Sequence, residues 1–260
     1  AASKERAEER ARLVRILRAE RFMGMDAASG SLISAMASAG VFRFGGTIIG
    51  THAFRLYKGE LGLRYRFDDL AQTGDIDIAS FERLSLALDH QAEPTVEKVL
   101  SDFAFDAVPA LDRGPAWRWR QSKGGALVEF LTPAFGEEGV RPLAALGVAA
   151  QALHHLNYLI ADPIPAAVLY RSGVLVQIPR PERFAIHKLI VAARREGRDR
   201  MKAEKDRRQA RFLIRALAED RPDDLKQAHR DALTLGPRWR ERIEATLAAM
   251  TEEAAILAAL

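Results

Sequence analysis

The sequence of 260 residues contains no cysteine. This absence excludes disulfide bonds, thiolate metal sites and a cysteine nucleophile. Long apolar runs are missing too, since none approaches the roughly 18 to 20 residues that a helix needs to cross a bilayer. The first residues, AASKERAEERARLVRILRAERF, are charged from the start and contain no signal-peptide hydrophobic region. We therefore expect a cytoplasmic protein that does not enter a membrane.

The chain has only a small excess of charge of one sign. It carries 39 Lys and Arg residues against 35 Asp and Glu residues, a net charge of +4 at pH 7. An excess of this size permits a polyanionic partner but does not require one. Hydrophobic residues make up 48% and charged residues 28%, which is ordinary globular composition. The length suffices for one large domain or two modest ones.

Strand signals are confined to the middle of the chain. The spacing predicts helices over 2–22 and 28–40, and then a buried strand at 41–49, VFRFGGTII. The later elements that we expect are a helix from Gly50 to about Gly62, a strand at 74–79, a helix at 94–104, a hairpin at 117–132, a helix carrying His154 and His155, and short strands at 165–170 and 173–178. After Pro179 and Pro181 the apolar spacing is helical throughout. The sequence therefore predicts an α+β protein, with N-terminal helices at 1–40, a sheet-containing core at 41–180 and a helical C-terminal region at 181–260.

Two carboxylates stand two residues apart in the run GDIDIA. On a strand, Asp75 and Asp77 project from one face, while Ile76 and Ile78 project from the other. Neighbouring carboxylates repel each other unless a cation lies between them. Magnesium suits such a pair, because it is bound by one or two carboxylates together with substrate phosphates. The alternative is a strand end with two solvated aspartates.

A third carboxylate interrupts an apolar strand. Glu129 lies at the centre of Leu-Val-Glu-Phe-Leu, and burying an unpaired carboxylate costs several kcal/mol. It therefore needs a cation as a partner, either an arginine of the same chain or a metal ion. On a strand beside the Asp-x-Asp strand, Glu129 would complete a two-metal cluster with Asp75 and Asp77.

A glycine and a threonine open a helix directly after the predicted strand at 41–49. A helix N-terminus offers free N–H groups and the positive end of the helix dipole, which suits a phosphate. Gly50 allows close approach of the backbone, and the Thr51 hydroxyl can donate to a phosphate oxygen. The alternative is an ordinary helix cap. His52, which follows, is interpreted as a packing or capping residue.

The order of these residues resembles the DNA polymerase beta-type nucleotidyltransferase superfamily. In that family a strand ends in Gly-Gly or Gly-Ser, a helix follows, the next strand carries Asp-x-Asp or Asp-x-Glu, and a later strand supplies a third acid. Here the corresponding residues are Gly50-Thr51, the segment Asp75–Asp77, and Glu129. Thr51 and Glu129 depart from the Gly or Ser and the Asp that are usual there. The segments GTHAFRLYKGELGLRY, TGDIDIA and VEFLTP look most like a bacterial family of nucleotidyltransferase-fold proteins.

A second segment resembles the abortive-infection branch of nucleotidyltransferases, which contains toxins. It runs from PERFAIHKL at 181–189 to Lys205-Asp206. In that branch a helix lysine faces the triphosphate and an acidic residue lies on the following helix, and by position these are Lys188 and Asp206. Lys188 is set among apolar residues, where an ammonium needs an anionic partner, either the triphosphate or an internal carboxylate. The resemblance covers roughly residues 30–220.

The resemblance implies a mixed sheet flanked by helices and the transfer of a nucleoside monophosphate from a nucleoside triphosphate to an acceptor hydroxyl. Asp75, Asp77 and Glu129 would be the catalytic and Mg²⁺ (or Mn²⁺) ligands. Gly50, Thr51 and Lys188 would hold the phosphates, with Asp206 supporting Lys188 or the metal. Thr73, just before the Asp-x-Asp strand, is either a further nucleotide contact or a turn residue.

The acceptor stays open between an RNA such as tRNA, a protein side chain and a small molecule. The arginine-rich stretch 194–211 favours RNA. Trp117 and Trp119, two apart on one strand face, could stack a base or cover the apolar side of the sheet. The rival to an enzyme is a non-catalytic module that binds a nucleotide or a partner on the same fold.

Overall fold

The computed structural model describes residues 2–63, 74–82, 91–109, 114–195 and 199–260. The chain divides into two compact units, Ala1–Ile178 and Pro179–Leu260. Within the described ranges, no helix combines the length and the apolar character that a membrane span requires.

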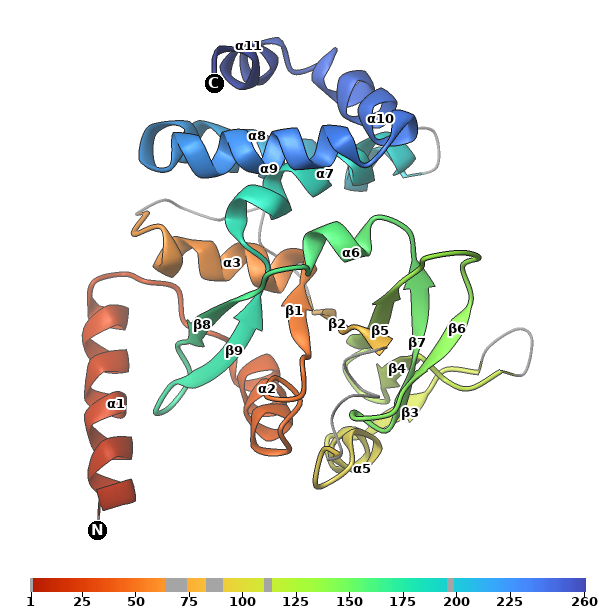
Figure 1. Ribbon diagram of the computed structural model, residues 1–260. Coiled ribbons are helices and arrows are strands. Elements are labelled where there is room, and N and C mark those ends of the chain that lie inside the picture. Colours follow the sequence, from red (N-terminus) through yellow and green to blue (C-terminus); the bar gives the residue numbers. More distant parts are fainter. Residues whose placement is uncertain (1, 64–73, 83–90, 110–113, 196–198) are drawn as a thin grey trace. The chain divides into compact units, whose positions relative to one another are not determined.

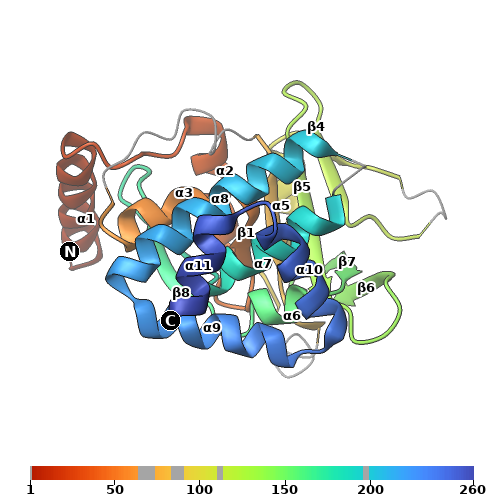
Figure 2. The ribbon, with the colours of Figure 1, turned by 90° about the horizontal axis from the view of Figure 1, so that it is seen from above.

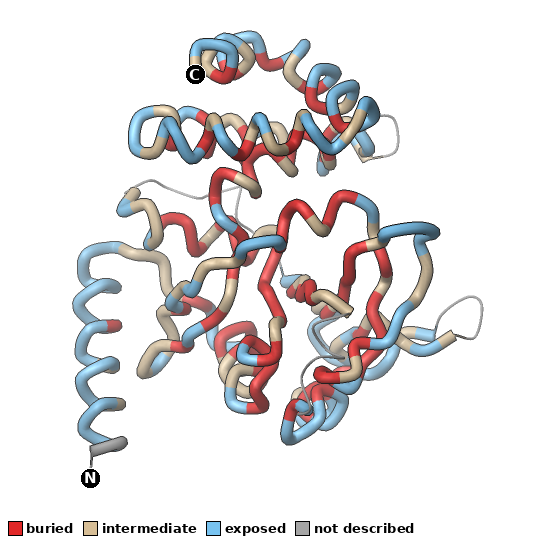
Figure 3. Tube along the Cα trace, viewed as in Figure 1, coloured by how far each residue is buried: buried red, intermediate tan, exposed pale blue. Residues whose placement is uncertain are grey.

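Two helices begin the first unit (Figure 1). α1 (Ala2–Ala19) is exposed along most of its length, and Val14 is its buried residue (Figure 3). α2 (Ala27–Ser38) starts where the Asp26 carboxylate accepts a hydrogen bond from the Ser29 N–H at 2.9 Å. This N-cap satisfies one of the N–H groups that a helix start leaves without an intrahelical partner. Both helices confirm the elements predicted for this part of the chain.

The main sheet of the first unit has seven strands and is mixed (Figure 1). In chain order they are β1 (Thr47–Ile49), β2 (Ile76–Ala79), β3 (Phe105–Ala107), β4 (Arg118–Gln121), β5 (Leu127–Pro133), β6 (Val140–Leu143) and β7 (Val148–Leu153). Their spatial order is β1-β2-β5-β4-β3, with β7 also on β5 and β6 on β7. β2 and β7 run parallel to β5, and the remaining pairs are antiparallel. This mixed sheet with its helices confirms the predicted α+β class.

Apolar residues that alternate along the central strands form the core of this unit. Ile78, Val128 and Phe130 are fully buried. α3 (Gly50–Glu60) packs on β1 and β2, and α5 (Val96–Asp102) packs on α2 and β3. A second sheet, formed by β8 (Ile164–Val168) and β9 (Val174–Ile178), packs against β1 and α2 through β9. The predicted hairpin at 117–132 and the short strands near 165–178 are confirmed.

Two expectations about local structure are wrong, and a third is confirmed with shorter bounds. Only Thr47–Ile49 of the predicted strand at 41–49 is extended, because the chain turns before it. The Gly46 N–H donates to the Val41 carbonyl at 2.9 Å, and Gly45 adopts the positive φ that this turn requires. His154 and His155 follow β7 rather than lying within a helix, and His155 has a φ of 73° just before the short helix α6 (Leu156–Leu159). The helix expected at 94–104 spans only Val96–Asp102.

The second unit consists of helices over its described residues (Figure 2). They are α7 (Pro181–Arg195), α8 (Arg200–Asp220), α9 (Pro222–Thr234), α10 (Pro237–Leu247) and α11 (Thr251–Ala259). Three of them begin with proline, whose fixed φ suits a first helical residue that needs no N–H partner. α7 packs against α8, α9 and α10, and the Thr246 hydroxyl donates to the Leu189 carbonyl at 2.7 Å. The helical character predicted after Pro179 is confirmed.

Candidate functional site

A row of charged residues crosses the main sheet of the first unit. In the β2–β5 pair the Cα partner of Asp77 is Glu129, and in the β5–β4 pair the Cα partner of Glu129 is Arg118. Directly opposed residues on neighbouring strands project from the same face, and the strands lie about 4.8 Å apart. The sheet therefore presents two carboxylates and one guanidinium side by side. The row has the charge order minus, minus, plus.

Asp77 lies against the first residue of α3. A Cβ added at Gly50 would meet Oδ2 of Asp77 well inside contact distance, and Gly50 has a φ of +65°. Both observations require glycine at this position, one through space and one through backbone conformation. The end of β1 and the start of α3 thus bring an acidic side chain and a helix N-terminus together, as predicted from the sequence.

Asp75 lies directly before β2, and its side chain has a structural contact. Its Oδ1 accepts a hydrogen bond from the Leu127 N–H at 3.1 Å. This bond fastens the start of β2 to the start of β5. Asp75 and Asp77 therefore both border β5, one through a hydrogen bond to its backbone and one through strand register with Glu129.

Glu129 is partnered by an arginine. The Arg118 Nε lies 2.6 Å from Glu129 Oε1, with side chains 38% and 21% exposed. The Arg118 guanidinium also lies over the Trp117 ring, 4.5 Å from its centroid. Glu129 therefore has an arginine partner, which was one of the two kinds of partner expected for it. Arg118 was not predicted as a site residue, although the alternation Trp-Arg-Trp-Arg places it on the face opposite the buried Trp119.

Asp75, Asp77 and Glu129 offer carboxylate oxygens, the ligand type that a divalent ion prefers, although the three do not surround a common position. Among the described residues, no group of three His, Asp or Glu side chains stands close enough together to hold a metal ion. Mg²⁺ needs only one or two carboxylates when substrate phosphates and water complete its octahedral shell. Asp75 and Asp77 fit that requirement, and Glu129 is paired with Arg118. The donor set therefore fits one Mg²⁺ that arrives with a triphosphate.

The N-terminus of α3 lies beside these acids. Its N-cap, Ile49, contributes no side-chain hydrogen bond to the first N–H groups of the helix. Thr51 is half-buried and His52 is fully buried. The burial of His52 agrees with its interpretation as a packing residue. Thr73 lies outside the residues that the structure describes, so its prediction is not tested.

A second ionic cluster forms within the helical unit. Lys188 Nζ donates to Asp206 Oδ1 at 2.5 Å, and Arg195 Nη1 donates to Asp206 Oδ2 at 2.7 Å. Asp206 is 1% exposed, and Lys188 lies 5.1 Å from the centroid of the Phe184 ring. Lys188 thus has the internal carboxylate that the sequence left open as its partner. The role of Arg195 was missed, and its spacing of seven residues from Lys188, two turns along α7, is the signal that places both on one helix face.

Trp117 and Trp119, the two tryptophans considered for base stacking, differ in solvent exposure. Trp119 is buried, whereas Trp117 is half-buried and contacts Arg118. Trp119 therefore covers the apolar side of the sheet, which was one of the two interpretations, and it cannot stack on a base without repacking the core.

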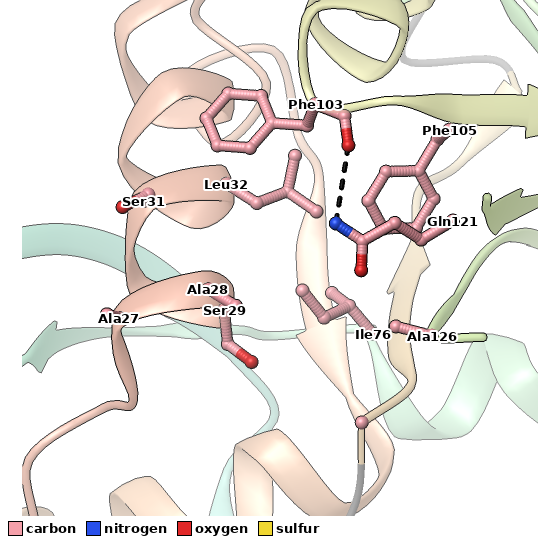
Figure 4. Close-up of a pocket in the computed structure, with 11 residues that line it drawn as sticks. Ala27, Ala28, Ser29, Ser31, Leu32, Ile76, Phe103, Phe105, Gln121 and Ala126 are labelled. Atoms are coloured by element: carbon pink, nitrogen blue, oxygen red, sulfur yellow. Dashed lines mark hydrogen bonds between the residues drawn. The ribbon is translucent and has the colours of Figure 1, made fainter. Parts of the chain in front are cut away.

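A cavity of about 330 Å³ lies elsewhere in the first unit (Figure 4). It is bordered by the first turns of α2 and by Ile76, whose side chain projects from the face opposite Asp77. Phe103, Phe105 and Leu32 supply apolar walls, and the Gln121 Nε2 donates to the Phe103 carbonyl at 3.3 Å. No charged residue is among the described residues that line it. The cavity therefore lacks the groups that a triphosphate requires.

Fold and site together define an α+β protein in which paired acids on a mixed sheet border the N-terminus of a helix. The family model described as Nucleotidyltransferase matches residues 27–234, so the chain belongs to this nucleotidyltransferase family. Among solved structures, the chain is similar to an antigenic nucleotidyltransferase-like protein from Paracoccidioides brasiliensis, with 14% identity and a TM-score of 0.39. That match covers 86% of this chain and 95% of the other. No curated protein matches the sequence.

Proposed function

We propose that the protein transfers a nucleoside monophosphate from a nucleoside triphosphate to an acceptor hydroxyl, using divalent metal at Asp75 and Asp77, and releases pyrophosphate as the bond between the α- and β-phosphates breaks. The observation that carries the proposal is the placement of Asp77, between Gly50 at the start of α3 and Glu129 on β5, in a chain of the nucleotidyltransferase family. A carboxylate beside a helix N-terminus can recruit a cation while the helix N–H groups bind the anion that the cation accompanies.

The acids have different roles in this proposal. Asp75 and Asp77 hold Mg²⁺ or Mn²⁺, and Asp75 is aligned for this by the Leu127 N–H. The ion, when bound, neutralises charge on the triphosphate and on the attacking oxygen. If Glu129 exchanged its partner Arg118, it would be available to a second ion, as the family resemblance implies, and would accept the proton of the acceptor hydroxyl.

The phosphate contacts come from neutral and basic groups. Gly50 brings the backbone close, Thr51 supplies a hydroxyl and, by the family resemblance, Lys188 supplies a charge. Asp206 orients Lys188 through the hydrogen bond at 2.5 Å. Arg195 shares that carboxylate, so Asp206 keeps one cation if Lys188 turns towards a phosphate. Thr73 is retained as a nucleotide contact from the resemblance alone.

The acceptor that we propose is an RNA end, in keeping with a toxin of the abortive-infection branch. Residues 179–260 contain 19 Lys and Arg against 14 Asp and Glu, whereas residues 1–178 contain 20 against 21. The excess positive charge of the protein therefore belongs to the helical unit, and such an excess favours binding to phosphates of a nucleic acid. Trp119 is buried, so base stacking on this residue does not contribute to the proposed RNA binding.

A second candidate function is binding without catalysis. The ion pair between Glu129 and Arg118 and the hydrogen bond from Leu127 to Asp75 give two of the acids structural partners without any metal. Such a protein would bind a nucleotide or a partner on the same surface and would not transfer the nucleotide.

One labelling experiment separates these functions. Purified protein is incubated with Mg²⁺ and each of the four nucleoside triphosphates, labelled on the α-phosphate, together with total RNA or cell lysate. Transfer is expected to label an acceptor that survives denaturing electrophoresis, and Asp75→Asn/Asp77→Asn protein should produce no label. Digestion of the product with ribonuclease or protease then identifies the acceptor class. Triphosphate binding without any labelled product would favour the binding module.

A further inference from the structure

Glu129 is in register with charged residues on both of its neighbouring strands. Asp77 is its Cα partner on β2, and Arg118 is its Cα partner on β4. Two carboxylates that project from adjacent strands repel each other, and a cation placed beside them relieves the repulsion. The Arg118 guanidinium, 2.6 Å from Glu129 Oε1, is that cation.

The environment of the Arg118–Glu129 ion pair allows Glu129 to exchange its partner. Both side chains reach solvent, at 38% and 21% exposure, and ion pairs this exposed contribute little to folding. The Trp117 ring supports the guanidinium from one side. A planar, weakly hydrated cation on an aromatic face needs no carboxylate to remain in place. Arg118 can therefore lose Glu129 and keep Trp117.

We propose that Arg118 is a positioning residue that competes with the divalent metal ion for Glu129. Without metal, Arg118 neutralises Glu129 and limits its repulsion of Asp77. When the ion binds, Glu129 exchanges the guanidinium for the metal, and Arg118 stays on Trp117. This inference rests on the proposed metal site at Asp75 and Asp77.

The competition predicts that removing Arg118 strengthens metal binding. Mn²⁺ alone, without nucleotide, is titrated into wild-type protein and into Arg118→Gln, with free Mn²⁺ followed by electron paramagnetic resonance. Removing one positive charge a few ångströms from the acids should tighten Mn²⁺ binding on the order of tenfold. Arg120→Gln is the matched control, because Arg120 is two residues away on β4 and its Cα partner on β5 is Leu127 rather than an acid. Its effect should be much smaller.

A double-mutant cycle tests whether the effect passes through Glu129. In a Glu129→Gln background, the change Arg118→Gln should no longer tighten Mn²⁺ binding. Tryptophan emission should change on Mn²⁺ addition in wild-type protein, and Trp117→Phe should remove most of that change. Thermal unfolding of each variant shows that the fold is kept.

The outcomes are distinct from those of the labelling experiment. Unchanged or weaker Mn²⁺ binding by folded Arg118→Gln would overturn the competition, as would an effect that persists without Glu129. Absence of Mn²⁺ binding in both wild-type protein and Arg118→Gln would overturn it too. If Arg118→Gln tightens Mn²⁺ binding but no triphosphate labels any acceptor, the competition stands and the transferase function fails.

Discussion

Oδ2 of Asp77 occupies the space that a Cβ would fill at Gly50, and this contact joins β2 to the first residue of α3. Gly50→Ala should therefore displace the Asp77 carboxylate and abolish metal-dependent nucleotide binding. It should also cost about 1–2 kcal/mol of stability, because an L-residue is strained at a φ of +65°. The control is Gly59→Ala in the same helix, where an added Cβ meets nothing within 4 Å. Calorimetric binding and thermal unfolding of both variants check this prediction, and full nucleotide binding by Gly50→Ala would contradict it.

Metal addition should stabilise the folded protein. We expect Mg²⁺ or Mn²⁺ to raise the unfolding temperature in the presence of a triphosphate, because a ligand that binds only the folded state stabilises it. The Asp75→Asn/Asp77→Asn protein should lose this response. Asparagine at position 75 keeps an oxygen that can accept a hydrogen bond from the Leu127 N–H, so the start of β2 should keep its structure. An equal shift of the unfolding temperature in the double variant would show that the metal does not bind at Asp75 and Asp77.

Lys188 should matter for triphosphate binding more than for folding. Lys188→Ala leaves Asp206 paired with Arg195, so the buried carboxylate keeps a cation. Triphosphate affinity should fall by about 1.5–3 kcal/mol, the range for a hydrogen bond to a charged group. Lys202→Ala, at an exposed position on α8, is the control. Calorimetry that finds wild-type affinity in Lys188→Ala would assign Lys188 a structural role.

Glu182 should make stability depend on pH. Desolvation raises the pKa of the buried Glu182 carboxyl, and the Arg221 guanidinium lies 3.8 Å from it. Since the folded state binds this proton more tightly, the stabilisation is fully present below about pH 4.3, the ordinary value for glutamate, and is lost as the pH rises through the folded-state pKa.

Glu182→Gln should consequently raise the unfolding temperature at pH 7, with the gain over wild type shrinking as the pH falls towards 4. The exposed Glu219→Gln serves as the control and should change little at either pH. A loss of stability at pH 7 in Glu182→Gln would show that the ionised carboxylate is favourable in the fold.

RNA as the acceptor predicts strong salt dependence. Each phosphate that the protein neutralises releases counterions, so transfer to RNA should fall steeply between about 50 and 200 mM salt. Replacing Arg194, Arg195 and Arg198 is not a clean test, since Arg195 pairs with Asp206 and Arg198 lies outside the described residues. The exposed Arg200 and Arg208 are better targets. Arg200→Ala/Arg208→Ala should weaken RNA binding and leave triphosphate binding intact, and labelling of a protein or small molecule without RNA would refute the RNA acceptor.

Local patterns were sufficient to predict part of the geometry around the candidate site. Alternation around Asp75 and Asp77 indicated one shared sheet face, and the Gly50-Thr51 step indicated where the helix begins. These features depend on residues close together in the chain. The Lys188–Asp206 pair also followed from position, through the family resemblance.

Contacts that depend on register between distant segments were not predicted. The pairing of Arg118 with Glu129 requires the exact alignment of β4 and β5, and alternation alone does not set that alignment. The hydrogen bond from Leu127 to Asp75 joins residues 52 apart in the chain. β7 was missed because its alanine-rich sequence, VAAQAL, has little of the β-branched and aromatic character that marks a strand.

Strand β5 is hydrogen-bonded along both edges, by β2 on one side and by β4 and then β7 on the other. Core strands of this kind open rarely, so their backbone amides are among the slowest in a native protein to exchange with deuterated solvent. Glu129 lies on this slow segment, whereas Asp75 lies just before β2, outside the strand. The acids of the proposed site therefore lie on backbone segments that we expect to open at different rates. Backbone adjustment to an incoming ion should therefore come from the Asp75 end, while on β5 only the Glu129 side chain changes its partner.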